Sequence, residues 1–287
     1  MAQKSVNIVN VRVDSTSIPG VLRFVVSRLT AGKKFLIVTP NPEQVVLAQK
    51  DPVFAKIISK ADLALPDGIG LVAADKFLRL PKAGNIFLAP ILYFAQGLGV
   101  GFSILFDRAW LSQNLSVIRG REMFLELVKL ANKKYWRVYL VGGWGKVAER
   151  TKILLAKNYK GVIVKAGTGP ILDNAATPIN SKEKEVEVKI IKDITDFKPH
   201  LLFVGFGAPV QEKWANSHLP KLNAGGVMVV GGTFDYISGR KKLPPSWVAD
   251  IGLEWLWRLI IGDQQVKRVI NAFPRFAFLM LTQKLKG

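Results

Sequence analysis

The 287-residue chain contains no cysteine and only two histidines, His200 and His218. Without thiols it cannot form a disulfide, a thiolate nucleophile or a zinc–thiolate site, and two histidines exclude a histidine-rich metal site. Acidic residues are also scarce, with 21 Asp and Glu against 41 Lys and Arg. The resulting formal charge of +20 predicts an anionic partner, which can be nucleic acid, an acidic membrane surface or a phosphate-bearing substrate.

The first twenty residues also lack the apolar run of a secretory signal, which favours a cytoplasmic protein. Apolar residues are abundant elsewhere and make up 49% of the chain. Over this length they are sufficient for a sizeable core and for one or two domains.

Short runs of β-branched residues alternate with helical patterns along most of the chain. Strands are predicted at 34–38, 61–65, 137–141, 162–165, 201–204 and 227–230, and helices at 17–30, 122–132 and 182–195. Residues 6–13 alternate like one further strand. Strands that alternate with helices of ten or more residues predict an α/β fold with a parallel sheet.

Four polar segments follow predicted strands. They are TPNPE at 39–43, ADLALPDG at 61–68, GFGAPVQE at 205–212 and GGTFD at 231–235. Ligands of open parallel sheets bind at the carboxyl ends of the strands, so these segments can converge on one substrate. Asp67 is the leading candidate for a catalytic group, and Gly68 lets another group approach the backbone closely. A Pro-Asp-Gly sequence alone is more often a simple turn that caps the next helix.

Together with YLVGGWGKVAE at 139–149 and GLEWLWRL at 252–259, these segments resemble the WecG/TagA/CpsF glycosyltransferases over nearly the whole chain. The resemblance implies a Rossmann-like α/β enzyme, with a mainly parallel sheet flanked by helices. It also implies transfer of an N-acetylmannosamine-type sugar from a UDP donor to a polyprenyl-diphosphate-linked sugar, a step in cell-surface polysaccharide synthesis at the membrane. No cofactor is expected beyond the UDP-sugar, which is the donor substrate.

The resemblance gives Asp67 the role of general base for the acceptor hydroxyl, in a single displacement that inverts the anomeric carbon. Thr39 is expected beside it as a second catalytic residue. Asn41 is expected to line the same pocket, although it could equally cap the helix that follows. Gln211 matches the glutamine of a family segment and is the third catalytic candidate, with an amide that could bind a sugar or phosphate oxygen. Glu212 could instead be a first-turn carboxylate favoured by the helix dipole.

The other expected substrate-binding positions are mainly glycines in the same loops. They are Gly68, Gly142, Gly143, Gly207, Gly231, Gly232, Thr233 and Asp235. Thr233 or Asp235 is expected to hydrogen-bond the uridine or its ribose. The Gly-Gly-Trp-Gly loop at 142–145 lacks the spacing of a dinucleotide fingerprint or a P-loop, which argues against a nicotinamide-dependent oxidoreductase.

The cationic positions depart from the family pattern. Val117 occupies the place of a usual arginine, and Arg119 or Arg121 is expected to substitute for it. Lys242 stands where an arginine is usual, and a lysine cannot make the bidentate phosphate contact of an arginine. Identical substrate specificity therefore does not follow from the resemblance.

Metal-independent transfer is the preferred hypothesis. Many sugar transferases hold a metal with an Asp-x-Asp triplet, and this triplet is absent from the sequence. The departing diphosphate would then be stabilised by cations, backbone N–H groups or helix N-termini. Arg258 and Arg268 match basic family positions and are expected to hold the diphosphate, whereas a third expected arginine falls near Gln265.

An apolar insertion at about 83–118 interrupts the predicted catalytic domain, residues 1–239. Residues 83–106 carry no charge, and the family usually has a much shorter connection here. Three readings remain open: a hairpin at the membrane interface, a core or oligomer contact, and a true span, which needs roughly 20 apolar residues. Pro90 and glycines 97, 99 and 101 fit a bent segment better than a straight helix.

Residues 240–287 form the predicted basic helical appendage, with nine Lys or Arg and three Asp or Glu. Basic and aromatic residues on amphipathic helices suit an anionic bilayer, which predicts peripheral association with the inner face of the cell membrane. A packed terminal helix is the plainer reading. A non-catalytic nucleic-acid-binding protein is the alternative from another class, but the aliphatic runs favour lipid and no nucleic-acid partner is expected. A homo-oligomer is possible.

Overall fold

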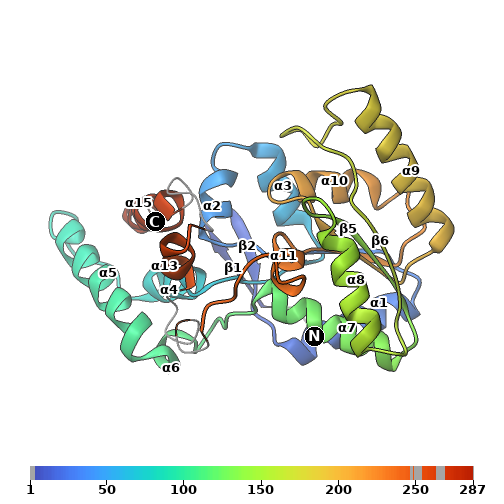
Figure 1. Cartoon of the computed structure of the whole chain (residues 1–287). Coiled ribbons are helices and arrows are strands. Elements are labelled where there is room, and N and C mark those ends of the chain that lie inside the picture. Colours follow the sequence, from blue (N-terminus) through green and yellow to red (C-terminus); the bar gives the residue numbers. More distant parts are fainter. Residues whose placement is uncertain (1–3, 246–247, 249–253, 263–268, 287) are drawn as a thin grey trace.

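A computed structural model of the chain describes residues 4–245, 248, 254–262 and 269–286 (Figure 1). Its main sheet has six strands in the order β4-β3-β8-β7-β5-β6, and every pair of neighbours is parallel. The strands are β3 Phe35–Val38, β4 Leu63–Ala64, β5 Arg137–Gly142, β6 Ile163–Gly167, β7 Leu201–Gly205 and β8 Gly226–Val229. The predicted parallel, Rossmann-like α/β sheet is confirmed.

Helices cover both faces of this sheet (Figure 1). One face packs against α1 Ile18–Thr30, α7 Gly120–Lys133, α8 Val147–Asn158 and the short α11 Thr233–Ile237. The other packs against α2 Pro42–Ala48, α3 Pro52–Lys60, α4 Ile69–Arg79, α9 Ser181–Phe197 and α10 Val210–His218. Successive side chains of a strand point to opposite faces, so a doubly covered strand reads as a continuous apolar run. In β3, Phe35 and Ile37 enter one core, whereas Leu36 and Val38 enter the other.

The N-terminal segment forms a separate hairpin instead of the single predicted strand. Strands β1 Ser5–Ile8 and β2 Val11–Asp14 pair in antiparallel register. Between them, Val9 and Asn10 adopt left-handed backbone angles, with φ of 47° and 64°. The prediction of one strand at 6–13 is wrong because the apolar alternation changes phase at Ile8 and Val9, where the chain turns. A valine is also an uncommon residue at positive φ, so the turn has little sequence signal.

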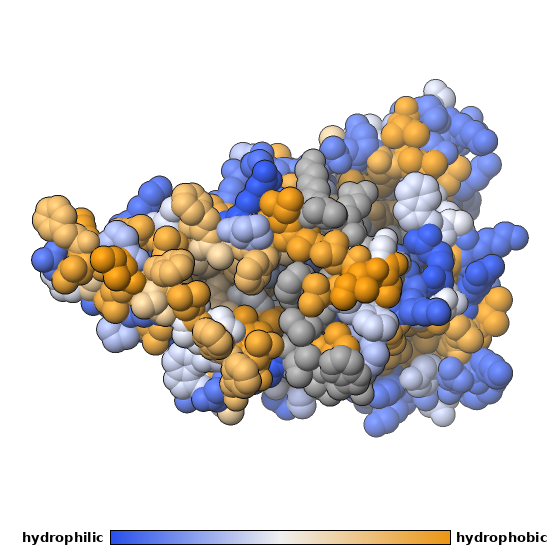
Figure 2. All heavy atoms as spheres, turned by 60° about the vertical axis from the view of Figure 1, so that its left-hand side comes forward, coloured by the Kyte–Doolittle hydropathy of each residue, from blue (hydrophilic) through white to orange (hydrophobic). Residues whose placement is uncertain are grey.

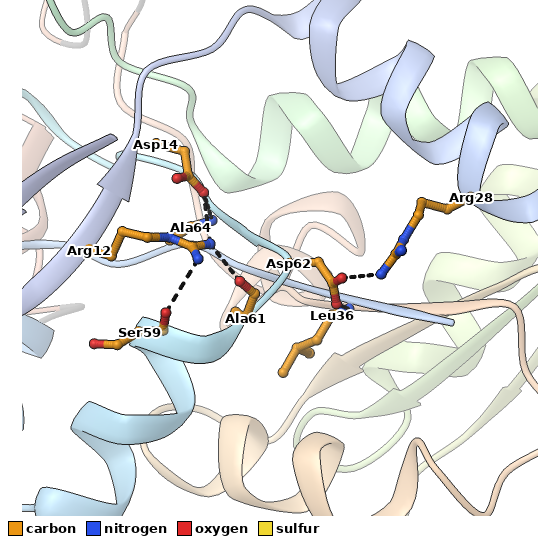
Figure 3. Close-up of polar contacts among 8 residues, drawn as sticks. All are labelled: Arg12, Asp14, Arg28, Leu36, Ser59, Ala61, Asp62 and Ala64. Atoms are coloured by element: carbon orange, nitrogen blue, oxygen red, sulfur yellow. Dashed lines mark hydrogen bonds and ion pairs between the residues drawn. The ribbon is translucent and has the colours of Figure 1, made fainter. Parts of the chain in front are cut away.

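Strand β4 has only two residues, and polar side chains hold both of its flanks (Figure 3). On the first flank, Oδ2 of the buried Asp14 accepts a hydrogen bond from the Ala64 backbone N–H at 2.8 Å. The Arg12 guanidinium donates to the same oxygen at 3.0 Å and also to the carbonyl of Ala61. The hairpin is thereby attached to the end of α3 and to β4.

Asp62 holds the second flank (Figure 3). Its Oδ2 accepts a hydrogen bond from the Leu36 backbone N–H at 2.9 Å, and its other oxygen pairs with Arg28 of α1. So short a strand contributes few ladder hydrogen bonds of its own. These carboxylates therefore fix the position of β4, and with it the loop that contains Asp67.

The apolar insertion folds as α5 Ala89–Phe106 and the short α6 Arg108–Leu111. The expectation of a bent segment is wrong, because α5 is one continuous helix of 18 residues. Pro90 lies in its first turn, where the missing N–H would have had no helical partner. The three glycines lower helix propensity without removing a backbone hydrogen bond.

The C-terminal part is helical, as expected, with α13 Glu254–Ile260, a π-helical turn at Asn271–Arg275 and α15 Phe276–Lys286. Helix α15 packs against α2, α4 and α5. It places Phe276 and Met280 in the core on the sheet face that α2 and α4 cover, where they are 6% and 4% exposed. A domain boundary at residue 239 stays a prediction. Arg268 lies outside the described residues.

Candidate active site

Five adjacent strands end in loops that carry the sequence-predicted residues. In sheet order, β4 leads to Asp67, β3 to Thr39, β8 to Gly231, β7 to Gly207, and β5 to Gly142. Because the strands are parallel, all five carboxyl ends lie at one edge of the sheet. Segments far apart in the sequence therefore meet there, as the sequence patterns indicated.

The loop that carries Asp67 is tied to the neighbouring loop after β3. The Asp67 backbone N–H donates to the carbonyl of Pro40 at 2.9 Å, next to Thr39. Gly68 follows with φ of 111°, a left-handed conformation that favours glycine and lets the chain turn directly into α4. Asp67 is partly exposed, whereas Thr39 is buried, with 7% of its surface accessible.

Gly120, the first residue of α7, lies against both Thr39 and Asp67. A Cβ atom added to Gly120 would be 3.4 Å from the Thr39 side chain and 3.6 Å from Oδ2 of Asp67. The start of α7 therefore lies beside the Asp67 carboxylate. Gly120 was not among the predicted site residues, and its place beside Asp67 is a result of the tertiary structure.

The two arginines beside Gly120 have different partners. Arg119 forms an ion pair with Glu122 on the first turn of α7, at 2.7 Å. Arg121 forms an ion pair with Glu254 of α13, at 2.5 Å, and both side chains are less than one-fifth exposed. This second pair attaches α13, the helix that carries Arg258, to the end of α7 beside Asp67.

Asn41 serves as a helix cap in the structure. Its Oδ1 accepts a hydrogen bond from the Gln44 backbone N–H at 3.0 Å, which satisfies one of the free donors at the start of α2. The capping role was the alternative considered for this residue. A role of Asn41 in substrate binding stays a prediction.

Gln211 connects the loops after β7 and β8. Its Oε1 accepts hydrogen bonds from the backbone N–H of Gly207 at 3.2 Å and of Gly231 at 3.0 Å. Its Nε2 donates to Oε1 of Glu212 at 3.0 Å. With 2% of its surface exposed, Gln211 sets the spacing of the two loops. The sequence indicated Gln211 for its amide but not that this amide bridges two loops.

Glu212 is a buried carboxylic acid that the sequence suggested only as a first-turn carboxylate. It is 1% exposed. Burial raises its pKa to about 7, although the hydrogen bond from Gln211 acts in the opposite direction. Among the described residues, its other oxygen, Oε2, has no hydrogen-bond partner. The acid therefore changes its charge near neutral pH immediately beside the residue that holds two site loops together.

The two polar candidates after β8 are engaged within the protein. The Thr233 hydroxyl donates to the carbonyl of Val230 at 2.6 Å. Asp235 lies in the first turn of α11, which starts directly after Gly232, and it pairs with Arg240 at 2.7 Å. Arg240 was not among the predicted site residues, because nothing in the sequence indicates its pairing with Asp235.

The site glycines divide into packed and open positions. A Cβ on Gly142 would lie 2.8 Å from the backbone of Gly205, and one on Gly143 would lie 2.2 Å from the Val147 side chain. Gly207 and Gly231 also have positive φ, but a Cβ there would meet no atom of a described residue within 4 Å. The first two glycines allow the loops to pack, whereas the other two border open space.

The remaining cationic candidates are less defined. Lys242 is exposed. Arg258 lies on α13, but its side chain, like the whole of Arg268, is outside the described part of the structure. Among the described residues, no group of three or more His, Asp or Glu side chains is arranged to hold a metal ion.

Comparison with known proteins agrees with this geometry. The model of the glycosyl transferase WecG/TagA/CpsF family matches residues 6–90 and 99–287. A Staphylococcus aureus (strain NCTC 8325 / PS 47) N-acetylglucosaminyldiphosphoundecaprenol N-acetyl-beta-D-mannosaminyltransferase is 27% identical over 250 residues, which cover 87% of this chain and 81% of the relative. The Bacillus subtilis (strain 168) enzyme of the same name is 26% identical over 250 residues, covering 87% and 80%. The chain therefore belongs to the WecG/TagA/CpsF family of glycosyltransferases.

Proposed function

We propose that this glycosyltransferase moves an N-acetylmannosamine-type sugar from a UDP donor to a polyprenyl-diphosphate-linked N-acetylglucosamine. The relatives from two organisms are named for transfer of this sugar to such an acceptor. The observation that carries the proposal is the placement of Asp67 beside Thr39 and the start of α7, at the sheet edge where five loops meet.

In the proposed reaction, Asp67 accepts the proton of the acceptor hydroxyl. The hydroxyl oxygen forms a bond to the anomeric carbon of the donor while the bond from that carbon to UDP breaks, and UDP leaves with the bonding electrons. One displacement inverts the anomeric configuration. A carboxylate serves as this base only when ionised.

We further propose that cationic side chains, without a metal ion, stabilise the departing diphosphate. Arg119 and Lys242 are candidates with described side chains, whereas Arg258 and Arg268 are candidates from the sequence. A positive charge placed where negative charge develops stabilises the transition state directly. The absence of an Asp-x-Asp triplet supports the same view.

The proposed place of action is the cytoplasmic face of the cell membrane, with peripheral attachment. A polyprenyl acceptor remains in the bilayer, so the enzyme must meet its diphosphate-sugar at the surface. The formal charge of +20 supports association with anionic lipids. The non-catalytic nucleic-acid-binding alternative is set aside, because the chain belongs to a family of enzymes.

The decisive experiment compares the wild type with Asp67→Asn. Transfer from UDP-N-acetylmannosamine to a polyprenyl-diphosphate-N-acetylglucosamine analogue is measured with a chelator present. We expect product from the wild type and a loss of about 10²–10⁴-fold in the variant, since asparagine cannot accept the proton. Asp196→Asn is the control, because Asp196 is a surface residue paired with Lys192 on α9.

Equal activity of wild type and Asp67→Asn would return Asp67 to the role of a turn residue. No product from the wild type with either chelator or added divalent metal would reject this donor and require a screen of other UDP-sugars. Product only with added metal would reject the metal-independent mechanism alone.

A further inference from the structure

Helix α5 extends from the body of the protein as an apolar arm (Figure 1). It is long and apolar enough to cross a membrane by length and composition, yet only 17% of its 18 residues are buried. Figure 2 shows hydrophobic side chains gathered over this arm. The expectation of a core contact therefore applies to a narrow stripe of the helix and not to the whole of it.

The inward stripe is firmly attached to the protein. Ala89, Tyr93 and Val100 are buried, and together with Gln96 they occupy one face of the helix. Gln96 Oε1 accepts a hydrogen bond from Nζ of the buried Lys284 at 2.6 Å, and its Nε2 donates to the carbonyl of Pro81 at 2.9 Å. The arm is therefore positioned along its length by α4 and α15.

The outward face is apolar and exposed. Ten large apolar side chains before and along α5 are at least 37% exposed: Ile86, Phe87, Leu88, Ile91, Leu92, Phe94, Leu98, Phe102, Leu105 and Phe106. No charged residue interrupts them, since the uncharged stretch runs from residue 83 to residue 106. An exposed apolar surface of this extent marks an interaction site.

The same helix cannot cross a bilayer while the protein keeps this fold. Its N-terminal end follows α4, and its C-terminal end leads into α6, which returns to α4. Lys76 of α4 donates to Gln113 at 2.7 Å, and Leu111 and Leu115 are buried in the core. Both ends therefore stay on one side, and the arm can only lie along a surface.

We propose that the outward face of α5 inserts into the interfacial layer of a lipid bilayer and holds the active site at the membrane surface. Basic side chains border this face as anionic lipids require. Lys82 precedes α5, and the exposed Lys286 lies at the end of α15, the C-terminal helix that packs on α5. Phe, Ile and Leu on one side of a helix with cations at its border favour the headgroup–acyl boundary.

The arm is coupled to the proposed catalytic residue by a single helix. Helix α4 begins immediately after Gly68 and ends at Arg79, close to the start of the arm. Its 11 residues span about 16 Å. An arm that lies in the lipid therefore sets both the height and the orientation of Asp67 above the bilayer. This inference builds on the proposed function, because the diphosphate-sugar of the proposed acceptor would meet Asp67 at that height.

The central part of the arm is specific to this chain relative to the family pattern. The family match ends at residue 90 and resumes at residue 99, so residues 91–98 inside α5 remain unmatched. These residues include Ile91, Phe94 and Leu98 of the outward face. The central part of the membrane-facing surface therefore lies outside the family match, whereas its two ends lie inside it.

The first test uses the absence of cysteine from the sequence. A single Phe94→Cys substitution in the full chain provides one site for an environment-sensitive fluorophore, and Val188→Cys on α9 provides a matched site, since Phe94 and Val188 are 62% and 59% exposed. Vesicles of phosphatidylcholine and phosphatidylglycerol are then added. We expect a blue shift and quenching by a lipid-borne quencher at position 94, and neither at position 188.

The second test measures flotation with the same vesicles. The variant Phe94→Gln/Leu98→Gln/Phe102→Gln removes three outward side chains, and Ile153→Gln/Ile163→Gln/Val188→Gln removes three of similar exposure from α8, β6 and α9. We expect partitioning to fall at least about tenfold in the first variant and to stay unchanged in the second. In the first variant, transfer to a vesicle-embedded acceptor should fall together with the partitioning, whereas transfer to a short-chain soluble acceptor should persist.

Equal flotation of the first variant and the wild type, or an unchanged label at position 94, would overturn the proposal. A wild-type dimer that ignores vesicles and becomes a monomer in the first variant would also overturn it, in favour of contact between two copies. Neither binding test requires sugar transfer, so an enzyme without the proposed activity would still give a clear result for the arm.

Discussion

At the scale of single residues, Glu212 is a buried acid whose side chain accepts a hydrogen bond from Gln211. The carboxylate oxygen Oε1 orients the Gln211 amide so that its carbonyl oxygen faces Gly207 and Gly231. A deprotonated acid at this site is costly, since no residue in the described part of the chain hydrogen-bonds Oε2. Glu212 therefore fixes the orientation of the Gln211 amide between two site loops, and its burial lowers the stability of the folded protein near neutral pH.

The stability of the protein should decrease as Glu212 ionises. Its folded pKa of about 7 lies above the ordinary value of 4.5, so the folded state binds this proton more tightly than the unfolded chain does. This contribution is fully present below about pH 4.5 and is lost as the pH rises through about 7, at a cost of roughly 3 kcal/mol. We expect Glu212→Gln to gain stability relative to the wild type when the pH rises from 4.5 to 8.

Denaturant unfolding at several pH values measures this difference. The variant Glu149→Gln, which changes a partly exposed glutamate of α8, is the control and should preserve the wild-type pH dependence. If the free energies of unfolding of wild type and Glu212→Gln changed in parallel with pH, Glu212 would not titrate in this range.

At the scale of secondary structure elements, Lys284 joins three helices. Its Nζ donates from α15 to the carbonyl of Phe77 on α4 and to Oε1 of Gln96 on α5, both at 2.6 Å. The ammonium also lies 4.5 Å and 5.0 Å from the ring centres of Phe77 and Tyr93. Burial lowers its pKa to about 8. One buried cation thus connects the C-terminal helix to the arm and to the helix that follows Asp67.

Replacement of this lysine should loosen α15. In Lys284→Met the Phe77 carbonyl and the partly buried Gln96 Oε1 lose their charged donor, and a hydrogen bond to a charged group contributes about 1.5–3 kcal/mol. We expect faster amide hydrogen exchange in α15 and in the part of α5 around residue 96. The control is Lys286→Met on the same helix, where the side chain is exposed. Unchanged exchange in Lys284→Met would show that apolar packing of Phe276 and Met280 is sufficient to hold the helix.

At the scale of the whole molecule, the C-terminal part meets the catalytic residues through Arg121 and Glu254. Their ion pair joins α13 to the start of α7, one residue after Gly120. A largely buried pair of this kind is costly to break, because the remaining charge loses its partner. The position of α13, and of Arg258 on it, is thereby coupled to the surroundings of Asp67.

A charge swap tests this coupling. We expect Arg121→Glu and Glu254→Arg each to reduce transfer about tenfold or more, which corresponds to at least about 1.4 kcal/mol. The double variant should recover much of the loss, because the pair is restored in the opposite sense. Additive losses in the double variant would indicate that the two residues act independently.

The sequence by itself determined the α/β architecture, the catalytic candidates and the edge of the sheet at which they meet. Strand runs, helix periods and turn residues are local signals, and parallel strands bring their carboxyl ends to one edge whichever order they adopt. Asp67, Thr39, Gln211 and the loop glycines could all be assigned to that edge in this way. Helical structure in residues 240–287 could be anticipated for the same reason.

Tertiary structure decided the rest, because it depends on contacts between residues distant in the chain. The order that inserts β8 between β3 and β7 brings Gly231 within reach of Gln211. Gly120 lies beside Asp67 only because α7 packs against that edge of the sheet. Helix α5 is apolar on all sides, so its periodicity carries no information about which side is buried. Only its packing on α4 and α15 determines which face remains for the membrane.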